Sequence, residues 1–362
     1  MTSKERVLRT FGKLPGKADK IPLQFDLCRS LTDYFATKYN MEAEYTLSYY
    51  EDLTYRISAN AIRTKMGSDC VVVGGSVAED FKAKEFPDGT ALNEFGMKMR
   101  PTSLYVEVVE CPLKDVETEE DLAKYNFPDA YAKGRFEDAK RDIKRFGKEY
   151  FVIGDVELSL FELAWHLVGM EKYLIELAMG SPWIAKLNDM VEEWTTGLAL
   201  SLIDLGVDAI WLGEDLGTQI SMLISPDMWR EHFKFRYERM IKKMKGANPD
   251  LLVIFHSDGA VAPLIDDFIE IGVDIYNPVQ PNVPGSDPQE LMDKYAGRIN
   301  FFGGIDQQEL LPSGNFEAIK EEIERRKNIM GKDGGYLMAP AHIIQADVEP
   351  ETVEFMCSLF KE

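Results

Sequence analysis

Eight short apolar runs, separated by segments with helical patterns, constrain the fold of this chain more than any other feature. Several runs are uninterrupted, such as residues 71–73 and 251–255, which is typical of parallel strands buried on both faces. Strands that alternate with helices predict an α/β fold, and eight such pairs predict a (β/α)8 TIM barrel. The expected strands are residues 21–26, 70–74, 150–157, 208–215, 251–258, 274–280, 299–306 and 335–342.

Helix starts are readable between these runs. Ser181, Ser225 and Asp287 each precede a proline, a combination that caps a helix and begins its first turn. Because no low-complexity linker interrupts the pattern, we expect one barrel domain over residues 1–362 that includes a short N-terminal extension.

The N-terminal third is less regular. Residues 79–112 contain Pro-Asp-Gly at 87–89 and an alternating apolar and polar segment at 103–109, which is typical of a hairpin. We therefore expect a β-rich insertion at residues 79–112 that forms a flap beside the barrel mouth.

The charge of the chain disfavours several classes of partner. A net charge of −21 argues against nucleic acid, anionic membranes and heavily anionic substrates, because each needs a basic surface. Residues 1–6 are charged and lack the apolar core of a signal peptide, and no long apolar run predicts a membrane span. We expect a cytoplasmic protein. The four cysteines are widely spaced, which indicates reduced thiols rather than disulfides or a thiolate metal site.

Most of the expected strands end on a side chain that can do chemistry. The active site of a (β/α)8 barrel is assembled from the C-terminal ends of its strands, so these side chains predict a site at one mouth. They are Asp26, Asp155, Glu157, Glu214, Asp215, His256, Asp258, Asn277, Gln280, Asp306 and His342.

His256 and Asp258 form the richest of these groups. Residues two apart on a strand project to the same side, so an imidazole and a carboxylate would face one space. Together they can bind a metal or exchange a proton. The alternative is that Asp258 caps the following helix while His256 makes a local hydrogen bond.

Glu214 and Asp215 are adjacent, so only one of the two carboxylates is expected to reach the mouth. Two acids at a strand end are costly to bury without a cation or strong donors. We favour Glu214 as the site residue by a narrow margin, with Asp215 pairing to neighbouring backbone.

The histidines extend this interpretation toward a metal. His256 and His342 end expected strands, whereas His166 and His232 lie in helical patterns. Histidine and carboxylate ligands from separate strands make a zinc site with an open position, which catalytic zinc requires. Asn277, Gln280 and Asp306 would either orient a substrate or close loops by hydrogen bonding; the residues alone favour neither.

Five motifs resemble the uroporphyrinogen decarboxylase superfamily, whose fold is a (β/α)8 barrel. They are Gly-Glu-Asp-Leu-Gly-Thr-Gln at 213–219, His-Ser-Asp-Gly at 256–259, Gly-Val-Asp-Ile-Tyr-Asn-Pro-Val-Gln at 272–280, Gly-Gly-Ile-Asp at 303–306 and Gly-Gly-Tyr-Leu-Met-Ala-Pro-Ala-His at 334–342. The resemblance is specific in the C-terminal half.

That resemblance implies one of two chemistries. The decarboxylases hold an octa-anionic tetrapyrrole with an arginine-rich segment after the first strand, whereas here Arg29 is the only cation within residues 25–30. The other branch comprises methyltransferases that use zinc as a Lewis acid and a corrinoid carried on a separate protein. This chain resembles the methyltransferase branch more closely.

It departs from the coenzyme M type, which binds zinc through a His-x-Cys pair and a later cysteine. The corresponding positions here are His256, Asp258 and the Ala341-His342 pair. A ligand set without thiolates suits ethers, alcohols or amines better than thiols. In this respect the chain resembles methyltransferases that demethylate methoxylated compounds.

The resulting hypothesis is methyl transfer from a small, methylated and possibly methoxylated donor to a corrinoid on a partner protein. Zinc would be held by Glu214, His256 and His342, and the catalytic residues would be Glu214, His256 and Asp258. Asp26, Asn277, Gln280 and Asp306 would bind the substrate.

Two rival functions remain, a metal-free decarboxylase that uses Asp26 beside a cation and a binding protein without catalysis. Phe25, Tyr105, Trp211 and Tyr276 would wall an apolar pocket or belong to the core. The apolar helix at 161–177 would pack in the barrel shell or in a homodimer interface.

Overall fold

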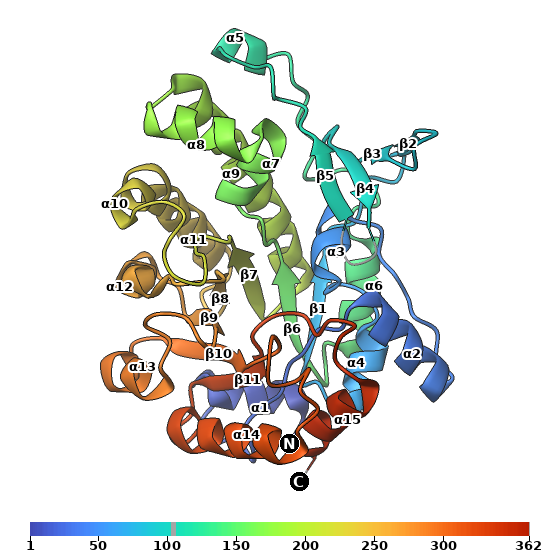
Figure 1. Ribbon diagram of the computed structural model, residues 1–362, viewed down its shortest axis with the longest axis vertical. Coiled ribbons are helices and arrows are strands. Elements are labelled where there is room, and N and C mark those ends of the chain that lie inside the picture. Colours follow the sequence, from blue (N-terminus) through green and yellow to red (C-terminus); the bar gives the residue numbers. More distant parts are fainter. Residues whose placement is uncertain (103–105, 362) are drawn as a thin grey trace.

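The computed structural model describes residues 1–102 and 106–361, and its centre is a parallel sheet whose strands alternate with helices (Figure 1). Strands that follow each other in sequence are also neighbours in space, in the order β1-β6-β7-β8-β9-β10-β11. They are Cys70–Gly74 (β1), Phe151–Asp155 (β6), Ala209–Gly213 (β7), Leu252–His256 (β8), Ile275–Val279 (β9), Asn300–Ile305 (β10) and Tyr336–Pro340 (β11). The predicted α/β barrel class is confirmed.

The first expected strand, residues 21–26, differs from the prediction because it forms no regular strand. Leu23 makes an isolated parallel bridge to Met338 in β11, and the Met338 amide donates to Pro22 at 3.1 Å. On the other side, the Asp69 amide donates to Leu23 at 2.7 Å, immediately before β1. Pro22 has no N–H to give to a ladder, so this segment joins the two edges of the sheet through scattered hydrogen bonds.

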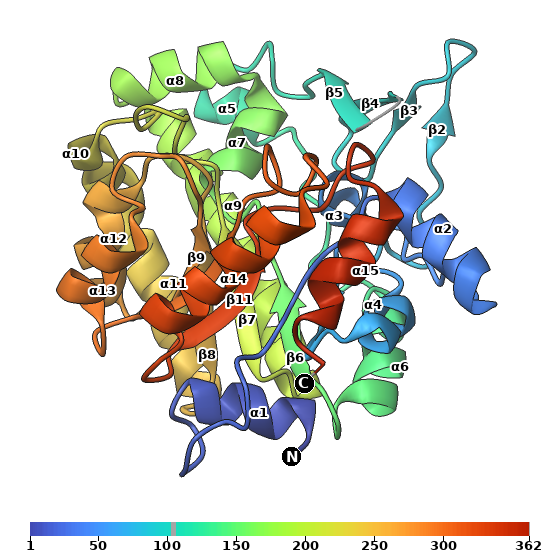
Figure 2. The same ribbon diagram turned by 60° about the horizontal axis from the view of Figure 1, so that its bottom comes forward.

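Helices cover the outside of the sheet (Figures 1 and 2). The long helix α9 begins at Pro182 after Ser181 and ends before Gly206, which has a positive φ of 95° and so stops the helix in a left-handed conformation. Its Leu187 and Leu198 are buried and belong to the larger of the two apolar clusters. The helices are Ser3–Thr10 (α1), Arg29–Tyr39 (α2), Tyr49–Thr54 (α3), Asn60–Met66 (α4), Glu119–Leu122 (α5), Glu137–Phe146 (α6), Phe161–Val168 (α7), Met170–Ala178 (α8), Pro182–Leu205 (α9), Pro226–Trp229 (α10), Arg230–Lys234 (a π-helical turn), Phe235–Ala247 (α11), Ala262–Leu264 (a 3-10 turn), Ile265–Ile271 (α12), Pro288–Tyr295 (α13), Phe316–Met330 (α14) and Pro350–Ser358 (α15).

Alternation along each strand creates two apolar layers. Val72 belongs to the cluster inside the barrel, whereas Val71 and Val73 belong to the cluster between the sheet and the helices. Helix α1 adds Val7 and Phe11 to the inner cluster and lies at the bottom of the molecule in Figure 2. The barrel interior is therefore packed at this end, which leaves chemistry to the opposite end.

The predicted β-rich insertion at residues 79–112 is present as an antiparallel sheet, in the order β2-β3-β4-β5, after the carboxyl end of β1. Its strands are Lys84–Glu85 (β2), Ala91–Leu92 (β3), Lys98–Pro101 (β4) and Val106–Glu110 (β5). Glu94 anchors the insertion to the barrel through a buried pair of hydrogen bonds from Arg135, at 2.9 and 2.8 Å. Residues 103–105 of the expected hairpin lie outside the described residues.

Within residues 1–102 and 106–361, none of the helices combines the length and apolar character needed to span a membrane. The four cysteines are unpaired; Cys28, Cys70 and Cys357 are buried and Cys111 is partly buried.

Candidate metal centre

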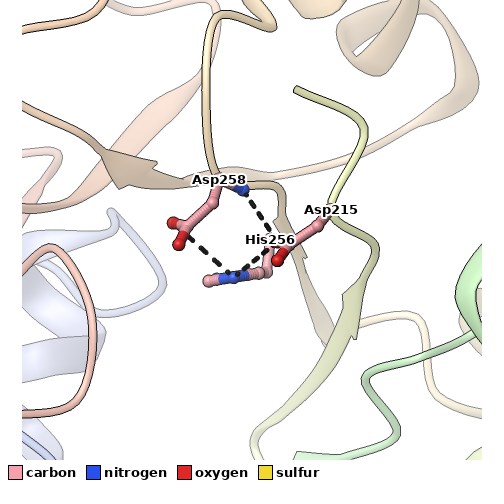
Figure 3. A group of neighbouring side chains, drawn as sticks. All are labelled: Asp215, His256 and Asp258. Carbon is pink, nitrogen blue, oxygen red and sulfur yellow. Dashed lines mark hydrogen bonds and ion pairs between the residues drawn. The ribbon is translucent and has the colours of Figure 1, made fainter. Parts of the chain in front are cut away.

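Two neighbouring strands bring a histidine and two carboxylates together. Strands β7 and β8 pair in register at Gly213 and His256, and Asp215 and Asp258 each follow two residues later. Figure 3 shows both carboxylates beside the imidazole. One ligand atom from each of Asp215, His256 and Asp258 lies within 4.8 Å of the others. We call these three residues the carboxylate–imidazole cluster.

Glycines allow the two loops to approach closely enough to form this cluster. A Cβ added at Gly217 would lie 2.7 Å from the Ala260 amide nitrogen, and one at Gly213 would lie 2.7 Å from the Cβ of His256. Gly259 also has a positive φ of 86°. The loops are joined by a hydrogen bond from the Ala260 amide to the Thr218 carbonyl at 2.9 Å.

The imidazole of His256 makes a hydrogen bond through one ring nitrogen and none through the other. Its Nδ1 lies 2.7 Å from Oδ1 of Asn277, while Nε2 has no hydrogen-bond partner although the residue is 1% exposed. Nε2 is 3.7 Å from Asp215, 3.8 Å from Asp258 and 3.6 Å from Glu157. Oδ1 of Asp258 is buried and unpartnered too. Two unsatisfied polar atoms that face each other are the arrangement expected of a cation site.

Charge in the cluster is concentrated and strongly interacting. Burial lowers the pKa of His256, but Asp215 and Asp258 outweigh burial and place that pKa above its ordinary value. Burial raises the pKa of Asp258, and the charge of Asp215 adds to this effect against the opposition of His342. Burial also raises the pKa of Asp215, yet His256 outweighs it and the net shift is downward. The cluster thus favours a positive charge between its carboxylates.

The structure departs from the expectation that Glu214, rather than Asp215, faces the site. The fully buried carboxylate of Glu214 accepts hydrogen bonds from three backbone amides at the start of α7, including Phe161 at 3.0 Å and Glu162 at 2.8 Å, and from the Tyr237 hydroxyl. Burial raises the pKa of Glu214 to about 7, although these donors oppose the shift. Neighbouring strand residues point to opposite sides, so Asp215 takes the place expected for Glu214.

His342 lies beside the cluster without joining it. Its ring centroid is 6.2 Å from that of His256, and it is not among the three residues whose ligand atoms lie within 4.8 Å. Burial lowers the pKa of His342, against the charge of Asp258. Its role as a ligand stays a prediction.

Asp26 belongs to a second buried group, which borders the cluster where Glu157 lies 3.6 Å from Nε2 of His256. Its carboxylate contacts Arg63 and also Nε of Arg56 at 3.4 Å, and Arg56 forms an ion pair with Glu157. Arg56 further lies over the ring of Trp211, 4.1 Å from its centroid. We call Asp26, Arg56, Arg63 and Glu157 the arginine layer.

The sequence prediction missed both arginines of this layer. They lie in and just before the short helix α4, in the irregular N-terminal third, where no strand pattern marks them as inward-facing. The acidic residues at the ends of two expected strands, Asp26 and Glu157, were the available signal that buried cations were needed.

The expected substrate residues all make protein contacts. Oε1 of Gln280 accepts from the Gly259 amide at 2.6 Å, and its Nε2 donates to Gln219 at 3.3 Å. Asp306 accepts from the amides of Gln308 and Glu309 at 2.8 and 3.2 Å. These are loop-closing bonds, and substrate contact by either residue stays a prediction.

Of the aromatic residues expected to wall a pocket or belong to the core, Phe25, Trp211 and Tyr276 are buried members of the apolar clusters. Tyr105 lies outside the described residues. A cavity of about 810 Å³ opens instead among the loops after β7, β8 and β9, where Leu223 and Tyr295 are among its lining residues.

Comparison with known proteins places this site in a family context. The family model for uroporphyrinogen decarboxylase (URO-D) matches residues 90–362, in agreement with the resemblance of the sequence motifs. No curated protein matches the chain. A methyltransferase from Methanosarcina mazei has a similar structure with a TM-score of 0.70 and 16% identity, covering 99% of this chain and 98% of that one.

A B12-independent methionine synthase from Shewanella sp. W3-18-1, solved with selenomethionine, is similar with a TM-score of 0.50 and 14% identity, over 83% of this chain and 84% of that one. At these identities the two likenesses establish the fold alone.

Proposed function

The chain belongs to the uroporphyrinogen decarboxylase family, and within it we propose a methyltransferase that moves a methyl group from a small methylated donor to a corrinoid held by a partner protein. The observation that carries this proposal is the carboxylate–imidazole cluster, with its unpartnered Nε2 of His256 and Oδ1 of Asp258.

The cluster fits a metal ion, and we propose zinc. His256, Asp215 and Asp258 would hold it through one nitrogen and two carboxylate groups, a set of three protein ligands that leaves a position for the donor. When bound, zinc supplies Lewis-acid polarisation of the donor heteroatom.

The residues of the chain determine which donors suit this site. None of the four cysteines belongs to the cluster, so its ligands are imidazole and carboxylate. Such a set favours an oxygen or nitrogen heteroatom over a thiol sulfur. Methoxylated compounds are therefore the first donors to test. The heteroatom would keep the electron pair of its bond to the methyl carbon, and the reduced corrinoid would supply the electron pair for the new bond to that carbon.

The corrinoid partner and the cytoplasmic location are part of the same proposal. The loop that carries Asp215 continues to Ile220, which is 82% exposed, and to Leu223 at the 810 Å³ cavity. An exposed apolar surface next to the cluster suits the approach of a protein that presents a cofactor there.

A metal-free decarboxylase of a small carboxylated substrate is the second candidate. The requirement that Asp26 have a nearby cation is met twice, by Arg56 and Arg63. These guanidinium groups are buried and already balanced by Asp26 and Glu157, so they are poorly suited to bind a substrate carboxylate. The cluster, in which Nε2 of His256 and Oδ1 of Asp258 lack a hydrogen-bond partner, favours the methyltransferase.

The test begins with elemental analysis of untagged protein purified without chelators. We expect near-stoichiometric zinc in the wild type, its loss in His256→Ala, and its retention in the matched control His232→Ala, which changes a histidine on the outer π-helical turn. Zinc-loaded protein should then methylate cob(I)alamin from a methoxylated donor. Protein that binds no zinc after incubation, but releases carbon dioxide from a carboxylated substrate, would favour the second candidate.

A further inference from the structure

Asn277 and His256 are paired across two strands at the mouth of the barrel. The residues are in register between β8 and β9, and both are buried, with exposed fractions of 1% for His256 and 3% for Asn277. Oδ1 of Asn277 lies 2.7 Å from Nδ1 of His256. Such a contact defines where the imidazole proton lies once the orientation of the amide is known.

The other end of the amide settles that orientation. Nδ2 of Asn277 donates to the carbonyl of Phe302 in β10 at 3.4 Å. A carbonyl oxygen only accepts, so the amide nitrogen must face β10 and the amide oxygen must face the imidazole. An oxygen at 2.7 Å in turn requires a proton on Nδ1 of His256. The neutral ring then carries its lone pair on Nε2, the atom that faces Asp215 and Asp258.

We propose that Asn277 is a positioning residue that fixes His256 in the Nδ1–H tautomer, with the lone pair of Nε2 directed into the cluster. The inference rests on the proposed metal site for its purpose, because only a lone pair on Nε2 can bind the ion. Metal-bound histidines usually donate their other N–H to such an acceptor, and losing it typically costs 10- to 100-fold in metal affinity.

An amide suits this position better than a carboxylate. Asp215, Asp258 and Glu157 already lie within 3.8 Å of Nε2. Asn277 supplies the required acceptor without adding a fourth negative charge. Both of its polar groups are used within the protein, so its proposed role is exerted through His256. Substrate contact by Asn277, which the sequence suggested, stays a prediction.

Nitrogen NMR of histidine-labelled wild-type protein, free of metal and at a pH where the imidazole is neutral, tests the tautomer directly. The His256 signals, assigned by their loss in His256→Ala, should show a protonated Nδ1 and an unprotonated Nε2. A protonated Nε2 would overturn the inference without any variant of Asn277.

Zinc affinity, measured by competition with a chelator, tests the consequence. Asn277→Leu should bind zinc roughly 10- to 100-fold more weakly, while Asn277→Asp, which keeps the acceptor, should recover most of the loss. Asn300→Leu is the matched control, because Asn300 bonds the Asp274 carbonyl at the other end of β10. Unchanged affinity in a folded Asn277→Leu would contradict the proposal.

The two proposals fail separately. Wild-type protein that shows the Nδ1–H tautomer but binds no zinc would refute the metal centre and leave the role of Asn277 in orienting the ring intact. Zinc binding with the other tautomer would refute the role of Asn277 alone.

Discussion

The carboxylate–imidazole cluster and the arginine layer are neighbours in the same barrel, in contact through His256 and Glu157, yet their buried carboxylates differ in how they are paired. In the arginine layer, Asp26 and Glu157 each contact a guanidinium group. In the cluster, Oδ1 of Asp258 and Nε2 of His256 have no partner. Charges that are paired within the chain serve its structure, whereas charges left unpaired at a strand end indicate a place for something the chain must bind.

The largest expected effect comes from breaking the arginine layer. Arg56→Met would leave Glu157 and part of Asp26 unpaired in the core, so the free energy of unfolding should fall by about 3 to 5 kcal/mol. Urea denaturation measures the change. Asp258→Asn removes one of two close carboxylates from the cluster and should lower the free energy of unfolding far less. Equal losses in the two variants would contradict the view that the arginine layer serves structure and the cluster serves binding.

The next largest effect is a pH dependence of the free energy of unfolding that we expect from Glu214 and not from its neighbour Asp215. Because burial raises the folded-state pKa of Glu214 from 4.5 to about 7, folding favours its protonated form. Its contribution to stability is therefore complete below pH 4.5 and is lost as the pH rises toward 7, by about 3 kcal/mol in total.

Glu214→Gln should flatten the pH dependence of the free energy of unfolding across this window while zinc binding persists. Asp215→Asn should do the reverse, weakening zinc binding without flattening that dependence. Denaturant titrations at several pH values, with zinc affinity measured alongside, distinguish the two. If Glu214→Gln lost zinc while Asp215→Asn kept it, Glu214 and not Asp215 would be the metal ligand.

The smallest effect concerns the approach of the two loops. Gly217→Ala places a Cβ against backbone atoms and should cost roughly 1 to 2 kcal/mol, with a matching loss of zinc affinity because Asp215 and Asp258 move apart. Gly246→Ala in α11 is the control, since no atom lies within 4 Å of an added Cβ there. A destabilised Gly217→Ala with unchanged zinc affinity would show that the cluster does not depend on this contact.

Apolar runs were sufficient to predict the barrel, because strands buried on both faces leave few alternatives. The strand predicted at residues 21–26 was wrong, because Pro22 limits pairing there and scattered hydrogen bonds replace a regular strand ladder. Insertion strands were also predictable from alternation and turn residues. Their anchoring by Arg135 and Glu94 was not, since it joins positions 41 residues apart.

Strand ends predicted the neighbourhood of the site better than its members. His256 and Asp258 were identified because two residues on one strand share a face. The choice between Glu214 and Asp215 was harder, because both residues follow the strand and the sequence does not show which of them points into the barrel. In the structure, backbone amides at the start of α7 donate hydrogen bonds to the carboxylate of Glu214. Asn277 was noticed as a polar strand end, but its contact with His256 is a property of strand pairing alone.

The contact between the glycine-bearing loops has an evolutionary consequence. Backbone atoms at Gly217 and Gly259 determine how closely the two loops approach, and a hydrogen bond from the Asp258 amide to the Asp215 carboxylate at 3.2 Å joins them further. Both contacts use backbone atoms of position 258, whatever side chain it carries. One scaffold could therefore carry a thiolate in place of the carboxylate at position 258, and the proposed metal would then suit a different leaving atom while the loops at the barrel mouth keep their backbone contacts. Single substitutions at such a ligand position would then change which substrates the barrel accepts, while the backbone of the two loops stays the same.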